Sequence, residues 1–251
     1  ISHAYLNMRC SINTLDILLD KAVEEPIGFA EDLSRLAAGE PLQYVTGKAY
    51  FFDRLFSLNA ATLIPRPETE ELVRQVLNLI GNEKKRVLDI GTGSGCIAIS
   101  LALEAPLAEV SAWDVAIEAI NKAQENADQL GAKVDVKHQD VFDWVKDSKV
   151  WDIIVSNPPY VAEGDPHMPA LRHEPRQALT SGPSGLQDIG HIVAHAPQYL
   201  QRGSWLLLEH GWDQARAVQK LLSHAGFSNI QTRQDLAGVD RCTGGCFDSE
   251  R

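Results

Sequence analysis

The chain has 251 residues, of which 44% are hydrophobic, and its formal net charge at pH 7 is -11. This length suits one large α/β domain with a small second domain, and the composition argues against disorder. The acidic balance counts against a nucleic-acid substrate, because phosphate backbones are attracted to basic surfaces.

The cysteines and the apolar runs predict in which cellular compartment the protein works and whether it associates with a membrane. Cys10, Cys96, Cys242 and Cys246 form no C-x-x-C pair, so we expect reduced thiols in the cytoplasm and no metal site. The longest apolar runs are far shorter than a membrane span, and we expect no membrane association.

The first part of the chain is expected to be helical. Apolar residues within 29–37 recur at the spacing of one helical face, and Gly39 marks the end of that pattern. Two runs rich in aromatic and β-branched residues, 44–52 and 55–58, predict a β-hairpin. A further helix is expected over 68–80.

Beyond Gly81, predicted strands and helices alternate. This rhythm predicts an α/β fold, a mostly parallel sheet with helices on both faces. In such sheets, ligands bind at the carboxyl ends of the strands. The predicted strands are 86–90, 109–113, 133–138, 150–156, 204–208 and 229–233, and the predicted helices are 96–104, 116–130, 185–199 and 214–225.

The first of these strands leads into the loop Asp89-Ile-Gly-Thr-Gly-Ser-Gly95. Alternating glycines allow a tight turn and a close approach of the backbone to a ligand, which suggests a nucleotide-like cofactor. A plain turn between strand and helix is the alternative. Asp114 ends the next strand, where its carboxylate can accept hydrogen bonds from two ribose hydroxyls. Asp140 ends the third strand and can accept from an adenine amine, or only cap a turn.

This D-x-G-x-G-x-G pattern resembles the class I methyltransferases that use S-adenosylmethionine. The resemblance implies a Rossmann-like domain with a mostly parallel seven-stranded sheet, and a glycine loop whose backbone receives the methionine part of the cofactor. It implies cofactor contacts from Asp89, Gly91, Thr92, Gly93, Ser94, Gly95, Asp114, Asp140, Val141 and Asn157.

The fourth strand of this domain ends in Asn157-Pro-Pro-Tyr160, and prolines cannot continue a central strand. In the methyltransferase resemblance, this motif marks enzymes that methylate a planar nitrogen, either the adenine amine or the glutamine side-chain amide. The side-chain oxygen of Asn157 and the backbone carbonyl of Pro158 can hold both hydrogens of such an NH2 group, which aligns the nitrogen and stabilises its developing charge. Tyr160 can stack on the planar group. We therefore expect Asn157, Pro158 and Tyr160 to be catalytic and Pro159 to complete the substrate site; a simple strand-ending turn is the alternative.

Three further segments closely resemble the HemK/PrmC family. They are Ile-Pro-Arg-Pro-Glu-Thr-Glu at 64–70, His-Glu-Pro-Arg-Gln-Ala-Leu at 173–179 and Leu-Leu-Leu-Glu-His-Gly at 206–211. That family methylates N5 of the glutamine in the G-G-Q motif of class 1 peptide chain release factors. The resemblance makes Arg66 a substrate or cofactor contact, although a capping and linker role is equally compatible with the segment.

The same resemblance implies three parts of the chain. We expect a helical substrate-binding domain at 1–48, a β-hairpin linker at 49–62 and the methyltransferase domain at 63–251. The first helix or two of the family's N-terminal domain are expected to precede residue 1.

Other functions remain open from the residues alone. A sister group methylates a glutamine of a ribosomal protein, and related enzymes methylate adenine N6, but the latter usually carry positive charge and a target-recognition region. A non-catalytic module is a third possibility, against which the glycine loop, Asp114 and Asn157 argue together. We expect a release factor as partner, no direct nucleic-acid contact and a monomer. Cys242 and Cys246 are interpreted as packing residues, and His191 and His195 as exposed side chains.

Overall fold

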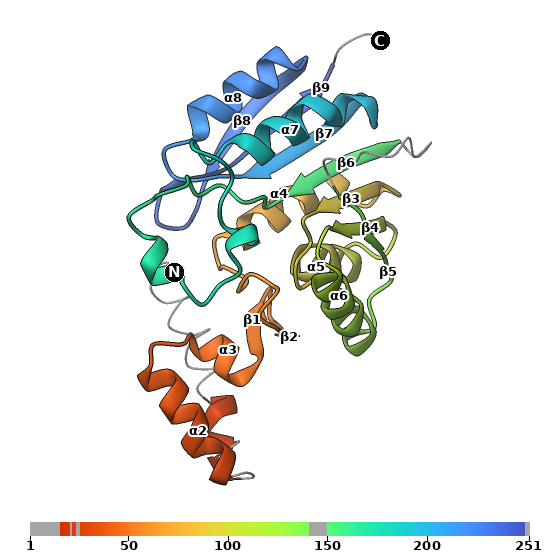
Figure 1. Ribbon diagram of the computed structural model, residues 1–251. Helices are drawn as coiled ribbons and strands as arrows, with labels where there is room; N and C mark the ends of the chain where they lie inside the picture. Colours follow the sequence, from red (N-terminus) through yellow and green to blue (C-terminus); the bar gives the residue numbers. More distant parts are fainter. Residues whose placement is uncertain (1–15, 21, 24–25, 141–149, 249–251) are drawn as a thin grey trace.

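The computed structural model describes residues 16–20, 22–23, 26–140 and 150–248 (Figure 1). Val141, predicted to contact the cofactor, lies outside these residues, as does Cys10. Residues 16–20 are helical, and α2 (Pro26–Ala37) and α3 (Leu42–Thr46) follow. The hairpin consists of β1 (Lys48–Phe51) and β2 (Arg54–Ser57), which pair antiparallel.

The predicted strand 44–52 is therefore wrong over its first half. Residues 42–46 form α3 instead, because Pro41 suits the start of a helix and Gly47 ends it in the left-handed conformation, with φ of 67°. The hairpin turn itself places Phe52 and Asp53 at φ of 50° and 58°. Two consecutive positive φ values are those of a type I′ turn, whose twist matches that of the paired strands.

Seven strands form the central sheet, in the order β5-β4-β3-β6-β7-β9-β8. All neighbouring pairs are parallel except those made by β9, which runs antiparallel to both β7 and β8. The expected mostly parallel seven-stranded sheet is confirmed. The strands are β3 (Arg86–Ile90), β4 (Glu109–Asp114), β5 (Val134–His138), β6 (Trp151–Ser156), β7 (Leu200–Glu209), β8 (Phe227–Gln234) and β9 (Asp240–Phe247).

Helices cover both faces of this sheet, and each face carries its own apolar core (Figure 1). Along β3, Val87 contributes to the core under α4 (Thr69–Ile80) and α5 (Cys96–Glu104). Leu88 contributes to the opposite core, under α7 (Gln187–His195) and α8 (Ala215–His224). The remaining helix is α6 (Ile117–Leu130), and the short 3₁₀ turns are η1 (Met168–Leu171), η2 (Arg176–Ala178) and η3 (Ala196–Gln198).

The chain reverses its direction of travel across the sheet between β3 and β6. From β3 it proceeds to β4 and β5 on one side, and from β6 to β7 on the other. Ile90 and Ser156 end these two strands as register partners, and the Ser156 hydroxyl donates to the Ile90 carbonyl at 2.7 Å. The glycine loop and the Asn157 motif therefore leave the sheet side by side, where open α/β sheets bind ligands.

The C-terminal strand accounts for two of the cysteines. Cys242 and Cys246 lie on β9 as free thiols, the first buried in a core and the second half-buried. Among the described residues, no cluster of histidines, cysteines and acids can hold a metal ion. Within the same residues, none of the helices has the length and apolar character needed to cross a membrane.

Candidate functional site

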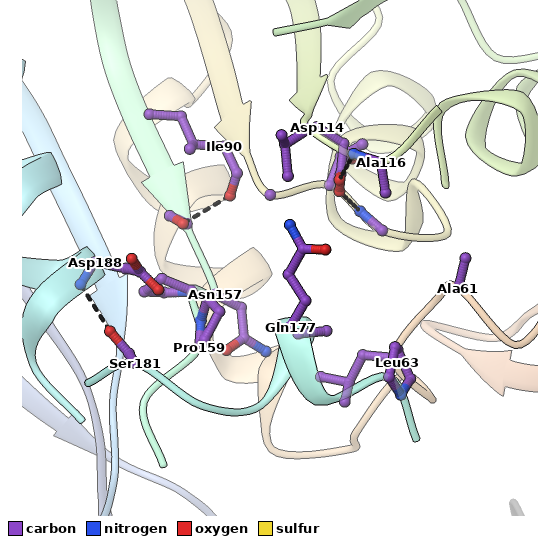
Figure 2. Close-up of a pocket in the computed structure, with 18 of the residues that line it drawn as sticks. Ala61, Leu63, Ile90, Asp114, Ala116, Asn157, Pro159, Gln177, Ser181 and Asp188 are labelled. Atoms are coloured by element: carbon purple, nitrogen blue, oxygen red, sulfur yellow. Dashed lines mark hydrogen bonds between the residues drawn. The ribbon is translucent and has the colours of Figure 1, made fainter. Parts of the chain in front are cut away.

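A cavity of about 570 Å³ lies at the carboxyl ends of β3, β4 and β6 (Figure 2). Its size is within the range of small-molecule sites. One side is the glycine loop and the residues after β4, and the opposite side is the Asn157 motif. The segment from Ala61 to Thr69 and the segment from Glu163 to Asp188 complete the lining.

The glycine loop takes the shape that its sequence predicts. Gly91, Gly93 and Gly95 have φ of 71°, 57° and 81°, which side chains rarely tolerate. At Gly95, an added Cβ would also meet the Ile99 side chain at 2.8 Å and Ala123 of α6 at 3.2 Å. Gly91, Thr92, Gly93 and Ser94 line the cavity, whereas Gly95 does not. Gly95 therefore serves the packing of two helices beneath the loop.

Asp89 supports the loop from below and does not line the cavity. Its side chain is fully buried, and one carboxylate oxygen accepts a hydrogen bond from the Thr92 hydroxyl at 2.7 Å. The other oxygen is buried without a partner. Burial raises the pKa of this carboxyl to about 7, against the opposing effect of the Thr92 hydroxyl. The direct cofactor contact predicted for Asp89 remains a prediction.

Asp114 stands at the tip of β4 and does line the cavity. Its two carboxylate oxygens accept the backbone N–H groups of Gly93, at 2.8 Å, and Ala116, at 2.9 Å (Figure 2). Each oxygen keeps a further lone pair for a ligand hydroxyl. Burial raises the pKa of Asp114 above its ordinary value. Asp140, at the end of the next strand, also lines the cavity.

The cavity is rich in carboxylates. Among the described residues that line it, Arg66 is the one basic side chain, and the acids are Asp114, Glu118, Asp140, Glu163 and Asp188. Such a lining attracts a cationic ligand and repels phosphate. It therefore fits S-adenosylmethionine, which carries a positive sulfur and an amine, better than a dinucleotide with its pyrophosphate.

Asn157 lines the cavity, and only one of the two polar atoms of its side-chain amide has a hydrogen-bond partner. Its side-chain nitrogen donates to the hydroxyl oxygen of Thr69 at 3.2 Å, and its side-chain oxygen is buried without a partner. A buried acceptor left unpaired costs free energy, which is typical of groups reserved for a ligand. Pro158 and Pro159 line the cavity beside it. The arrangement can accept hydrogen bonds from an NH2 group placed in the cavity.

Tyr160 points away from the cavity. It packs against the core under α7 and α8, and its hydroxyl donates to Glu209 at 3.3 Å. Its backbone is held by Gln214, whose side-chain nitrogen donates to the Tyr160 carbonyl at 3.0 Å. An added Cβ at Gly185 would come within 2.2 Å of that carbonyl. In this structure Tyr160 anchors the backbone of the Asn157 motif. Stacking of its ring on the substrate remains a prediction.

Arg66 lies between β2 and α4 and connects two segments around the cavity. Its guanidinium pairs with Glu174, a carboxylate in the segment after the Asn157 motif, and it also lines the cavity. Glu174 is buried, and its second oxygen accepts the backbone N–H of Ile64 at 3.4 Å. The ion pair with Glu174 is observed, while a contact from Arg66 to substrate or cofactor remains a prediction.

Sequence reasoning missed several lining residues. Gln177 reaches from η2 into the middle of the cavity, and Asp188 lies at its edge, with its backbone N–H donating to the Ser181 hydroxyl at 2.7 Å (Figure 2). Thr69, the partner of Asn157, was treated only as part of a motif. Gln177 and Thr69 lie within motifs 173–179 and 64–70, but those motifs do not show that the two residues reach the cavity, because this depends on contacts between segments distant in sequence.

Comparison with known proteins decides the family. The family model described as methyltransferase small domain matches residues 69–208, more than half of the chain. The release factor glutamine methyltransferase of Neisseria gonorrhoeae is 45% identical over 238 residues, covering 92% of this chain and 87% of that protein. The Vibrio cholerae protein of the same name is 42% identical over 237 residues, covering 92% and 83%.

The chain belongs to the release factor glutamine methyltransferase family. The fold agrees, since the crystal structure of a methyltransferase from Pyrococcus furiosus matches with a TM-score of 0.57 at 15% identity, covering 77% of this chain and 89% of that one. As a member of the release factor glutamine methyltransferase family, the protein is an enzyme that transfers methyl groups. The resemblance drawn from its motifs is confirmed.

Proposed function

We propose that this protein transfers a methyl group from S-adenosylmethionine to the side-chain amide nitrogen, N5, of the glutamine in the G-G-Q motif of class 1 peptide chain release factors. The observation that carries the proposal is the buried, unpartnered side-chain oxygen of Asn157, a residue that lines the cavity beside the glycine loop. Relatives that share over 40% of their residues with this chain carry the same activity in their names. Because release factors act in translation, we place the reaction in the cytoplasm.

The residues present suit the cofactor. The loop from Gly91 to Ser94 would hold its methionine part, Asp114 its ribose hydroxyls and Asp140 its adenine, and the acidic lining favours its positive charge. When bound, S-adenosylmethionine supplies a methyl group on a positively charged sulfur, which is a good leaving group.

Asn157 and Pro158 perform the positioning that the acceptor nitrogen requires. An amide nitrogen is a weak nucleophile, because its lone pair is shared with the carbonyl. The Asn157 oxygen and the Pro158 backbone carbonyl each accept one hydrogen of the substrate NH2, so the nitrogen is held in line for attack. Both acceptors stabilise the positive charge that develops on nitrogen, which then releases a proton. The two prolines limit the backbone freedom that this geometry must overcome.

A substrate assay separates this proposal from its alternatives. Methyl transfer from labelled S-adenosylmethionine is measured in parallel to a purified class 1 release factor, total ribosomal protein and adenine-containing DNA, and the modified residue is located by mass spectrometry. We expect label on the G-G-Q glutamine. Label on a ribosomal-protein glutamine or on adenine alone would contradict the assignment of the substrate.

Removal of the Asn157 acceptor tests the mechanism. Asn157→Ala is expected to lower kcat by about 10²- to 10³-fold, because one group that stabilises the transition state is lost. Affinity for S-adenosylhomocysteine, measured by calorimetry, is expected to change little. Near-normal turnover of this variant would show that the two-acceptor mechanism is wrong.

A further inference from the structure

The backbone of the Asn157 motif needs support from outside the motif. Pro158 and Pro159 have no N–H groups, so they cannot donate the backbone hydrogen bonds that hold a strand in its sheet. The proposed reaction nevertheless requires a fixed Pro158 carbonyl, because that oxygen accepts one hydrogen of the substrate NH2 group. The contacts of the next residue, Tyr160, therefore decide how firmly the motif is held.

Tyr160 is held at both ends by β7 and the loop that follows it. The phenol hydroxyl donates to the Glu209 carboxylate at 3.3 Å, and the backbone carbonyl accepts from the Gln214 side-chain nitrogen at 3.0 Å. Glu209 is the last residue of β7, and Gln214 directly precedes α8. Glu209 thus restrains the ring, and Gln214 restrains the main chain two residues after Pro158.

The Gln214 carboxamide uses both of its ends. Its nitrogen also donates to the Ser184 carbonyl at 3.3 Å, and its oxygen accepts the Gly211 N–H at 2.8 Å. Carbonyls can only accept and a backbone N–H can only donate, so these partners fix the orientation of the amide. Ser184 lies in the turn before α7, whose first two residues line the cavity. One side chain therefore joins the Asn157 motif, the entry to α7 and the loop after β7.

The backbone of the turn before α7 packs closely against this hydrogen bond. An added Cβ at Gly185 would come within 2.2 Å of the Tyr160 carbonyl oxygen and 2.9 Å of the Gln214 side-chain nitrogen. Gly185 also has φ of 71°, a value that favours glycine. A glycine at this position therefore lets the turn approach the contact between Gln214 and Tyr160.

We propose that Gln214 is a positioning residue that fixes the backbone of the Asn157 motif, and with it the Pro158 carbonyl, for the acceptor nitrogen. Gln214 does not line the cavity, so it acts through Tyr160 and not on the substrate. The identity of the acceptor rests on the proposed function, whereas the restraint on the backbone can be measured without it.

A simpler role for Gln214 would be to support its own loop. Its side-chain oxygen accepts the Gly211 N–H, which by itself ties the loop to the start of α8. An ionised carboxylate in place of the amide preserves that contact and is favourable at a helix N-terminus. It cannot donate to the Tyr160 carbonyl, because it has no hydrogen. Gln214→Glu therefore separates the two roles.

Steady-state kinetics at about pH 8, where an ordinary glutamate is ionised, compare two variants with the wild type. In Gln214→Glu and in Gln214→Leu, we expect kcat per folded enzyme to fall about 10- to 100-fold, because the Pro158 carbonyl is misplaced. The KM for the release factor and the affinity for S-adenosylhomocysteine should stay within about threefold. Gln219→Leu is the control, since it removes a side-chain hydrogen bond from α8 to Thr232, and it should leave kcat unchanged.

Hydrogen exchange measured by mass spectrometry tests the restraint itself, without any substrate. The Val161 N–H donates to the Leu179 carbonyl at 2.8 Å, so peptides that cover 160–163 report how firmly the main chain after the prolines is held. We expect faster exchange there in Gln214→Glu than in the wild type. Gln219→Leu should exchange at the wild-type rate in the same peptides.

Three results would overturn the proposal. Near-normal kcat in Gln214→Glu would show that Gln214 only supports its own loop. A fall in kcat matched by an equal loss of affinity for the cofactor would indicate general damage to the site. Unchanged exchange over 160–163 would show that the motif is held without Gln214. Failure of the proposed function would appear separately, as absence of label on the release factor with wild-type enzyme, and the exchange measurement would still test the restraint.

Discussion

Asp89 is a fully buried carboxyl group beneath the glycine loop, and its protonation affects the stability of the fold. Its pKa is raised to about 7 by burial, from an ordinary value of 3.8. Between these two values the folded protein holds a proton that the unfolded chain has released. The free energy of unfolding must therefore fall as the pH rises toward 7 and then level off.

Asp89→Asn should remove this dependence, because the amide stays neutral at every pH. Between pH 5 and pH 8, we expect the free energy of unfolding to fall by about 2 kcal/mol less in the variant than in the wild type. Urea unfolding at the two pH values measures the difference. Glu209, whose pKa is also raised to about 7, accounts for a slope that remains. An identical slope in both proteins would mean that Asp89 is already ionised at pH 5.

At the scale of elements, one asparagine connects the hairpin, the glycine loop and α6. The Asn126 side-chain oxygen accepts the Ser57 N–H at 2.8 Å, and its nitrogen donates to the carbonyls of Ser57, at 3.0 Å, and Ser94, at 2.9 Å. Asn126 is fully buried. The glycine loop therefore owes part of its position to a hairpin some forty residues earlier.

Asn126→Leu keeps the size of the side chain and leaves these backbone groups unpaired. We expect a loss of about 2–4 kcal/mol in the free energy of unfolding, because buried unpaired groups bear their desolvation cost. Affinity for S-adenosylhomocysteine should weaken as well, since Ser94 belongs to the cofactor loop. Urea unfolding and calorimetry check the two effects. Gln124→Ala, on the exposed side of the same helix, should change neither, and equal effects in both variants would contradict the role given to Asn126.

Most elements could be predicted from periodicity, and the exceptions have physical reasons. The predicted helix over 96–104 and the strand over 86–90 have the observed bounds. The strand β9 is not among the six strands predicted from the residues, because Cys-Thr-Gly-Gly-Cys lacks the side chains that favour strands; the resemblance implied only that a seventh strand exists. Space around the glycines of β9 is tight, since an added Cβ at Gly244 would meet the Leu207 side chain at 3.1 Å and one at Gly245 the Phe227 side chain at 3.0 Å.

The residues of the candidate site likewise fall into those that a local motif predicts and those that only the packing of distant segments brings together. Residues in local motifs, such as Gly91, Asp114 and Asn157, line the cavity at the carboxyl ends of the strands, where the sequence predicts that a ligand binds. Asn157 could be seen in its motif, but not its contact with Thr69, which lies 88 positions earlier in the sequence. Contacts of that kind depend on the packing of whole elements, and one sequence carries no direct sign of them.

Across the whole molecule, the segment after the Asn157 motif joins the cavity to the N-terminal helices (Figure 1). At one end Gln177 enters the cavity. Further along, Glu174 pairs with Arg66, between β2 and α4, and Arg172 donates to the carbonyl of Ala38, just after α2, at 2.8 Å. A protein substrate held by the N-terminal part would thus contact the same segment that shapes the cavity.

Glu174→Gln should loosen this connection without disturbing the cofactor side. The Glu174 carboxylate is buried and Arg66 is partly exposed, so loss of the pair also lowers stability, and it frees the segment that a large substrate must meet. We expect the KM for a release factor to rise about tenfold, equivalent to about 1.4 kcal/mol, with kcat and S-adenosylhomocysteine affinity nearly unchanged. Steady-state kinetics with varied release factor measures the effect. Glu104→Gln removes the carboxylate of an exposed ion pair with Arg54 that lies outside the cavity, and should leave KM as it is. A rise in KM for both variants would point to a general effect of charge, and a change in kcat alone would place Glu174 in the chemistry instead of in substrate docking.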